Sequence, residues 1–255
     1  GYERVLTARL SDAWYLYHED LKRPLEDRIA DLDRVTFFEG LGSIGDKARR
    51  TGSLAKEIAP AAGADPAAAE KAALLAKADL TTGMVYEFPE LQGLMGRYYA
   101  LAQGVDAQIA DAIRDHYAPK GADDDVPTAP VSVAIALADK IDTLTAFWAI
   151  GKKPTGSGDP FALRRAALGI VELVLSRTIR TKIASSFNLP LRNVVSIISA
   201  ESRDDIESRV DALIGTGAIE SIEVGTTDVP QVEEILANWW VIKESLLSFF
   251  HDRLK

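Results

Sequence analysis

The residue pair with the most specific chemical meaning in this sequence is His251-Asp252, a His-Asp dipeptide. Metal-dependent phosphohydrolases of the His-Asp type combine such a pair with an upstream histidine and a downstream aspartate, so that imidazoles and carboxylates converge on one or two metal ions. Only Arg253, Leu254 and Lys255 follow the pair, and none of them is an aspartate. We therefore expect His251-Asp252 to form the polar end of a surface helix.

Two glycine-rich segments match nucleotide-binding loops in spelling but not in context. Residues 40–45, GLGSIG, fit the dinucleotide pattern G-x-G-x-x-G, which requires a buried strand before it and a helix after it within a βαβ unit. No second β–α unit follows, so a turn and a helix entry are favoured. Residues 151–158, GKKPTGSG, lack the lysine that follows the second glycine of a Walker loop. This segment is not an ATP site, but a basic loop can still contact nucleic-acid phosphates.

The composition excludes several other kinds of site. The sequence has no cysteine and three histidines, which rules out disulfides, thiolate zinc sites and cysteine nucleophiles and makes a histidine-rich metal centre implausible. No uncharged apolar run reaches about 18 residues, and the first residues lack the basic and apolar regions of a secretory signal. With 255 residues, 47% of them hydrophobic, a sizeable core is expected. We expect a globular, soluble and cytoplasmic chain.

The elements that must position any site are predicted to be helices. An aspartate followed by proline starts the patterns at 66–87 and from 160 onward, and such a pair suits the first turn of a helix. Residues 131–150 have an apolar face interrupted by Asp139, Lys140 and Asp142. Strand patterns are scarce. Further helices are predicted at 105–117, 190–200, 203–214 and 230–254, loops at 38–46, 118–130 and 151–159, and the strand candidates are 34–38 and 219–224. The sequence therefore predicts an all-α fold.

Charge is distributed unevenly along the chain. The net charge is −9, yet residues 143–200 contain eight basic and two acidic side chains, a local balance of +6. Such asymmetry can indicate an anionic partner for one face. The alternative is that these helices extend long basic side chains into water and bind nothing.

Longer strings in the sequence resemble one known family. RVLTARLSDAWYLYHEDLKRPLEDR, LGSIGDKARR, KADLTTGMVYEFPELQGLMGRYYA, ALADKIDTLTAFWAIGKKPTGSGDPFALRRAALGIV and LLSFFHDRLK are similar to the β subunit of bacterial glycyl-tRNA synthetase. The similarity covers much of residues 3–175 and is looser from 176 to 245. The combination of EFPELQG and GRYYA with KPTGSGDPFALRRAA is its most specific part.

This resemblance implies an architecture and a set of partners. It implies a degenerate HD-phosphohydrolase-like helical domain over residues 1–175, followed by an additional helical segment, 176–255, that leads towards an anticodon-binding domain. In that enzyme the α subunit holds the active site for glycine and ATP, and the β subunit supplies most tRNA contacts. The implied partners are the α subunit and the tRNA for glycine, with no membrane and no DNA. No cofactor is implied for this segment, whereas the whole enzyme uses ATP with magnesium.

The resemblance also locates what is left of a His-Asp metal site. The central pair corresponds to Ala78-Asp79 in LAKADL, so the histidine ligand is absent, and the downstream aspartate corresponds to Asp139 in ALADKID. Phe38 lies near the position of the upstream histidine and cannot bind a metal. We expect no metal and no phosphohydrolase activity. Asp79 and Asp139 are then expected to form a helix cap or a buried ion pair, with a lysine such as Lys77 or Lys140.

The candidate tRNA-binding residues come from the basic stretch. Arg164 and Arg165 point about 100° apart on a helix, so at most one is expected to share a partner with the preceding loop, and Arg164 is favoured. The candidates are Lys152, Lys153, Arg164, Arg165, Arg177, Arg180 and Lys182. Two other functions remain as alternatives: an active metal-dependent phosphohydrolase of the HD type, and a purely structural helical scaffold that docks the α subunit.

Overall fold

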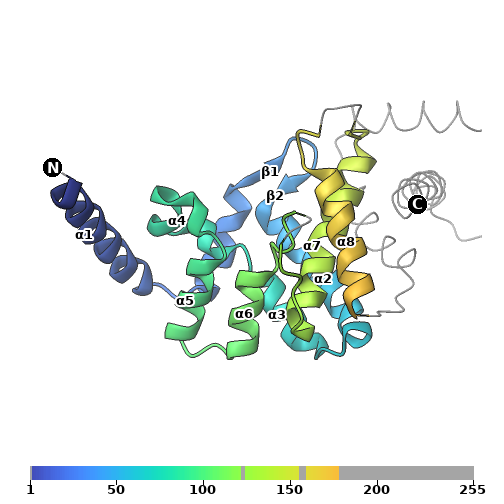
Figure 1. Ribbon diagram of the computed structural model, residues 1–255, viewed down its shortest axis with the longest axis horizontal. Coiled ribbons are helices and arrows are strands. Elements are labelled where there is room, and N and C mark those ends of the chain that lie inside the picture. Colours follow the sequence, from blue (N-terminus) through green and yellow to red (C-terminus); the bar gives the residue numbers. More distant parts are fainter. Residues whose placement is uncertain (1, 122–123, 155–158, 178–255) are drawn as a thin grey trace, which may run out of the picture.

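The computed structural model describes residues 2–121, 124–154 and 159–177, and within these ranges the fold is all-α apart from one short hairpin. Figure 1 shows α1 (Tyr2–Leu21) projecting from one end of a helical body. The body contains α2 (Ile44–Ala62), α3 (Pro66–Leu75), α4 (Gly83–Glu87), α5 (Leu94–Ala102), α6 (Ala107–Asp115), α7 (Pro130–Ala149) and α8 (Leu163–Arg177). The 3₁₀ helices of the described residues are η1 (Glu26–Arg34), η2 (Ala78–Thr81) and η3 (Pro89–Leu91). No described helix is both long and apolar enough to cross a membrane.

Helix α7 forms the centre of the core. It packs against α2, α3, α6 and α8, and nearly all of its residues are buried. A helix surrounded on every side must be apolar on every side, which explains the run VSVAIALA at residues 131–138. The three charged residues that interrupt this pattern are therefore carried into the interior, where they need partners.

The segment 38–46, predicted as a loop, contains half of a two-stranded antiparallel hairpin. Strand β1 (Thr36–Phe38) confirms part of the predicted strand at 34–38, and it pairs with β2 (Gly42–Ser43). Gly40 and Gly42 turn the chain with φ angles of 79° and 80°, a backbone region that favours glycine. The GLGSIG segment is thus a turn and a helix entry, as predicted.

Ser43 is the N-cap of α2, and it forms a capping box with Asp46. The Ser43 hydroxyl accepts the Asp46 N–H at 3.0 Å, and the Asp46 carboxylate accepts the Ser43 N–H at 2.8 Å. Burial raises the pKa of Asp46, but the hydrogen bonds from Ser43 and Arg49 outweigh that effect and lower it to about 2. This cap fixes the first turn of α2, whose next turn carries the buried cations described below.

Two helix predictions need correction. The predicted helix at 66–87 begins as expected, with the Asp65 carboxylate accepting the Ala68 N–H, but it is broken into α3, η2 and α4. The break turns Asp79 inward, and Thr82 caps the new helix α4. The helix predicted from residue 160 begins instead at Leu163. Asp159 still caps it, because its carboxylate accepts the N–H groups of Leu163 at 2.7 Å and Arg164 at 2.9 Å.

Asp20 joins the end of α1 to the body. Its carboxylate accepts the N–H groups of Gly83 and Met84 at the start of α4, at 2.8 and 2.9 Å, and the Tyr99 hydroxyl at 2.9 Å. Arg28 donates to both the main chain and the side chain of Asp20.

The predicted segment 176–255 lies outside the described residues, apart from its first two positions. The helices predicted at 190–200, 203–214 and 230–254 and the strand candidate at 219–224 also lie outside them.

Candidate functional site

The two aspartates expected from the sequence belong to the same buried charged region but have separate partners. Asp139, on α7, is contacted by two ammonium groups, with Lys47 Nζ 3.3 Å and Lys77 Nζ 3.4 Å from its Oδ1. Burial raises the pKa of Asp139, but Lys47 and Lys77 outweigh that effect and hold it well below its usual range. Asp139 is thus a carboxylate in a buried ion-pair network, and its pairing with Lys77 confirms the expectation.

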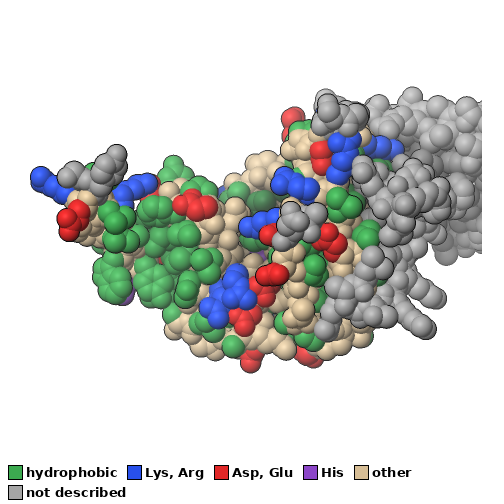
Figure 2. Space-filling view, viewed as in Figure 1, with side chains coloured by type: hydrophobic (Ala, Val, Ile, Leu, Met, Phe, Trp, Pro, Cys, Tyr) green, Lys and Arg blue, Asp and Glu red, His purple; other side chains and the backbone are tan. Residues whose placement is uncertain are grey.

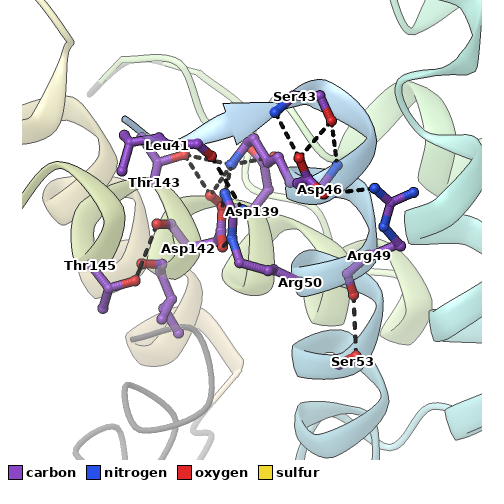
Figure 3. A network of polar contacts seen from close by, with 12 residues as sticks. Leu41, Ser43, Asp46, Arg49, Arg50, Ser53, Asp139, Asp142, Thr143 and Thr145 are labelled. Atoms are coloured by element: carbon purple, nitrogen blue, oxygen red, sulfur yellow. Dashed lines mark hydrogen bonds and ion pairs between the residues drawn. The ribbon is translucent and has the colours of Figure 1, made fainter. Parts of the chain in front are cut away.

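Asp142, one turn further along α7, is the most deeply buried acid of this network. Its side chain is 0% exposed and lies between two cations of α2. Lys47 Nζ is 3.1 Å from Oδ2, and Arg50 donates from Nε to Oδ1 at 2.7 Å and from Nη2 to Oδ2 at 3.3 Å. Figure 3 shows Asp139 and Asp142 directed towards α2, with Arg50 reaching across to Asp142. The network therefore joins the two longest helices of the body.

Asp79 acts as a helix cap. Its Oδ2 accepts the N–H groups of Gly93 at 2.5 Å and Gly96 at 3.1 Å, which are unpaired donors at the start of α5. Gly96 permits this approach, since a Cβ there would lie 2.7 Å from Ile113 Cγ2 and 3.1 Å from Asp79 Oδ2. Burial raises the pKa of Asp79 to about 6, an effect that these two N–H groups only partly offset.

His116 is a buried neighbour of this network that the sequence did not single out. It is the C-cap of α6, and its Nδ1 lies 2.7 Å from the carbonyl oxygen of Ile113, which assigns the ring proton to that nitrogen. Burial, reinforced by Lys77, lowers the pKa of His116 well below its usual value, so the ring is neutral. Its ring is 3.8 Å from that of Tyr117, and Lys77 Nζ lies 4.0 Å over the Tyr117 ring.

These donors do not fit a metal ion of the His-Asp type. The carboxylate of Asp139 is occupied by two ammonium groups, that of Asp79 caps a helix, and residue 78 is alanine. Phe38 contacts the rings of Phe147 and Phe161 at 5.2 and 5.3 Å in an apolar cluster. Among the described residues, no group of three or more His, Asp or Glu side chains is placed to hold a metal. The lysines supply the positive charge that these carboxylates require.

Substituting Asp79 tests its role as a cap. We expect Asp79→Ala to lower the free energy of unfolding by about 1–3 kcal/mol, because two buried N–H groups lose their acceptor. Asp79→Asn keeps an acceptor and should cost less. The folded pKa of about 6 lies above the ordinary 3.8, so the folded protein binds the proton more tightly and its stability falls as pH rises between these values.

Urea denaturation at several pH values from 4 to 7 measures both effects. The Asp79→Asn variant should remove the part of the pH dependence that the parent shows between about 4 and 6. An alanine variant as stable as the asparagine variant at pH 7 would show that the two N–H groups do not depend on this carboxylate.

The candidate basic residues have different surroundings. Lys152 and Lys153 follow the end of α7 and are exposed, and Lys153 Nζ lies 5.7 Å over the Trp148 ring. Arg164 and Arg165 are the second and third residues of α8 and lie in its first turn. Arg164 is half-buried and Arg165 is exposed. Arg177 ends α8, with a side chain outside the described residues, as are Arg180 and Lys182 altogether. Figure 2 shows Lys and Arg side chains over the α7–α8 part of this face, with Asp and Glu among them.

Comparisons with known proteins agree on one family. Residues 1–255 match the family model described as glycyl-tRNA synthetase beta subunit. The chain is 47% identical, over its whole length, to a glycine–tRNA ligase beta subunit from Dinoroseobacter shibae, of which the match covers 34%. It is 57% identical over 73% of its length to the corresponding protein from Paracoccus denitrificans, of which 28% is covered. The chain thus spans about a third of the length of the relatives it matches.

Proposed function

The chain belongs to the glycyl-tRNA synthetase beta subunit family, and we propose that it contributes tRNA binding and subunit architecture to the ATP-dependent charging of tRNA with glycine. Activation of glycine with ATP and magnesium is assigned to the α subunit. The observation that supports this division is the pairing of the buried carboxylates with lysine and arginine, which leaves them structural, while other cations are exposed on the surface.

tRNA binding by this segment would depend on phosphate contacts. Lys152 and Lys153 follow the end of α7 and are exposed, so their ammonium groups can approach a sugar–phosphate backbone without disturbing the core. Contacts to phosphates position a nucleic acid without reading its sequence. Recognition of glycine tRNA in particular would then come from other parts of the enzyme.

The phosphohydrolase alternative has little chemical support. A metal-assisted hydrolysis needs carboxylates and imidazoles directed at an open metal position. Here Asp79 and Asp139 are committed to backbone N–H groups and lysines. Among the described residues His116 Nε2 is left without a hydrogen-bond partner, but this one imidazole nitrogen is not joined by enough other donors to hold a metal. We propose that the domain retains an HD-like helical frame in which these residues stabilise the packing.

Docking of the α subunit is a second candidate function, favoured by the surface of α1. Five large hydrophobic side chains of this projecting helix are 61–68% exposed: Val5, Leu6, Leu10, Trp14 and Tyr15. Figure 2 shows hydrophobic side chains gathered at this end of the molecule. Exposed apolar patches of this kind are typical of protein interfaces. We propose the α subunit as the partner that covers the α1 face, because a beta subunit by definition acts with another subunit.

Lysine footprinting separates the two roles. The complete enzyme is treated with an acetylating reagent in the presence and absence of tRNA, and the β subunit with and without α. We expect tRNA to protect Lys152 and Lys153 at least threefold while α does not. Lys56 and Lys71, exposed on α2 and α3, are internal controls that should react equally throughout. If the α subunit protects Lys152 and Lys153 while tRNA does not, the result would establish the scaffold function and refute tRNA contact by these lysines.

A further inference from the structure

A cavity of about 310 Å³ opens between the α6–α7 connection and α8, on the outer side of the buried network. Its walls include Tyr117 and Lys120 from the connection, Asp139 and Lys140 from α7, and Arg165 from α8. Segments 45 residues apart in the sequence thus place three cations around one hollow. Its volume is at the small end of the range for ligand sites, which suits a compact charged group rather than an extended apolar ligand.

Lys140 provides a fixed charge at the base of this cavity. It is 6% exposed, and its Nζ donates to the carbonyl oxygens of His116, Tyr117 and Ala118 at 3.4, 3.4 and 2.8 Å. A Cβ on Gly169 of α8 would lie 2.7 Å from Lys140 Cε, so glycine leaves the room that the lysine stem needs. The ammonium group is held by these carbonyls, and it acts on the cavity through its charge rather than as a movable ligand.

Lys120 and Arg165 at the rim are, by contrast, exposed and without an ion-pair partner among residues 2–121, 124–154 and 159–177. Most described arginines of the body have one, such as Arg97 with Asp111 and Arg49 with Asp33. The Lys120 ammonium lies 5.6 Å from the centre of the Tyr117 ring, which forms part of the same wall. Two cations without an ion-pair partner in the described part of the chain, next to the fixed charge of Lys140, favour an anion between them.

The acids near the cavity do not cancel this charge. Asp139 is the one carboxylate among the described lining residues, and Lys47 and Lys77 already contact its Oδ1. Asp124, exposed beside the rim, accepts the Lys120 backbone N–H at 2.8 Å. Among the described residues that line the cavity, Lys120, Lys140 and Arg165 therefore outnumber the single carboxylate of Asp139, and the lining keeps a positive balance.

We propose that this cavity holds one phosphate group of the tRNA backbone, contacted by the Lys120 ammonium and the Arg165 guanidinium above the fixed charge of Lys140. A guanidinium can donate two parallel hydrogen bonds to phosphate oxygens, whereas a lysine acts as a point charge. The proposal rests on the proposed tRNA-binding function and makes it more specific. It selects Arg165, rather than the Arg164 favoured from the sequence, as the residue of this pair that contacts the partner.

The test compares the tRNA affinity of two double variants of the complete α/β enzyme. Lys120→Ala/Arg165→Ala removes the two rim cations, and Lys56→Ala/Lys71→Ala removes two exposed cations from α2 and α3, so both variants lose the same net charge. For the rim variant we expect at least a tenfold loss of affinity at low salt. The slope of log affinity against log salt concentration should flatten by about 0.7–0.9 for each lost contact. The α2/α3 variant should stay within twofold of the parent.

The outcomes separate this proposal from the function on which it rests. If the parent enzyme binds tRNA with salt dependence and the rim variant behaves like the α2/α3 variant, the cavity proposal is overturned while the proposed function stands.

A second experiment titrates the tRNA-free enzyme with inorganic phosphate and follows the melting temperature. Stabilisation by phosphate that the rim variant lacks, with unchanged tRNA affinity, would assign the cavity to a small phosphate compound and overturn the RNA assignment. Unchanged melting temperatures of both variants without ligand show that the fold is intact.

Discussion

Replacing Asp142 with alanine is expected to lower the free energy of unfolding by about 3–5 kcal/mol. The carboxylate is 0% exposed, and it is the shared partner of Lys47 and Arg50, whose side chains are 5% and 3% exposed. Without Asp142, the hydrogen bond that Arg50 keeps within the described part of the chain is a long one to the carbonyl oxygen of Leu41, at 3.5 Å. Two cations would then be buried with too little negative charge, which costs far more than the loss of an exposed pair. Domains are typically stable by about 5–15 kcal/mol, so this change removes much of the total.

Urea denaturation of residues 1–255 measures this effect, with Asp33→Ala as the matched control. Asp33, in η1, pairs at 2.8 Å with Arg49, which lies on α2 like Lys47 and Arg50, but both side chains of this pair are 50% exposed. The control should therefore cost less than about 1 kcal/mol. Asp142→Asn, which keeps the shape and one acceptor, should fall between the two and provides a measurable variant if the alanine variant fails to fold. Equal stabilities for Asp142→Asn and Asp33→Ala would contradict the role given to this carboxylate.

Local sequence signals predicted the features that depend on neighbouring residues. The Asp65-Pro66 pair identified the start of α3, and the apolar pattern at 131–150 identified α7 to within one residue at each end. The glycines at 40 and 42 indicated a turn because only local backbone conformation is involved. Helix starts and apolar helical patterns of this kind recur along the chain, and they were therefore sufficient to predict the all-α fold class.

The partners of the buried charges could not be predicted, because they depend on how distant helices pack. Lys47 and Arg50 are 95 and 92 residues away from Asp142, and nothing in the pattern of α2 marks them as buried. Asp79 was expected to form a helix cap or an ion pair. It caps α5, whose Gly93 lies 14 residues further along the chain, and it can do so because the chain turns after α3. A continuous alanine-rich pattern hides that turn, since alanine is favourable in a helix whether or not the helix continues.

The candidate binding site was predicted only in part for the same reason. The basic residues of 143–200 were evident, but Lys120 precedes that stretch and Lys140 was considered only as an ion-pair partner. The structure brings these two lysines to one cavity with Arg165 because α8 packs along α7. Residues that line one cavity can come from distant segments of the chain. Counting charges along the sequence therefore identified Arg165 as a binding candidate but not Lys120 or Lys140.

Replacing Lys152 and Lys153 with alanine is expected to weaken tRNA binding by about tenfold at low salt. Both side chains are exposed beyond the end of α7, so the substitutions leave the core unchanged. Each phosphate contact that is lost reduces the counterions released on binding, which lowers the affinity similarly for different tRNA sequences. Glycine activation in the absence of tRNA should be unaffected, because these residues are assigned no part in it.

The most direct test of the account is therefore the salt dependence of tRNA affinity for the complete α/β enzyme with and without Lys152→Ala/Lys153→Ala. The account predicts lower affinity and a slope of log affinity against log salt that flattens by about 0.7–0.9 per lost contact, while glycine activation without tRNA keeps its rate. The Lys56→Ala/Lys71→Ala enzyme serves as the control of equal charge and should match the parent in slope. Unchanged affinity and slope in the Lys152→Ala/Lys153→Ala enzyme would contradict the account and leave this segment as a scaffold.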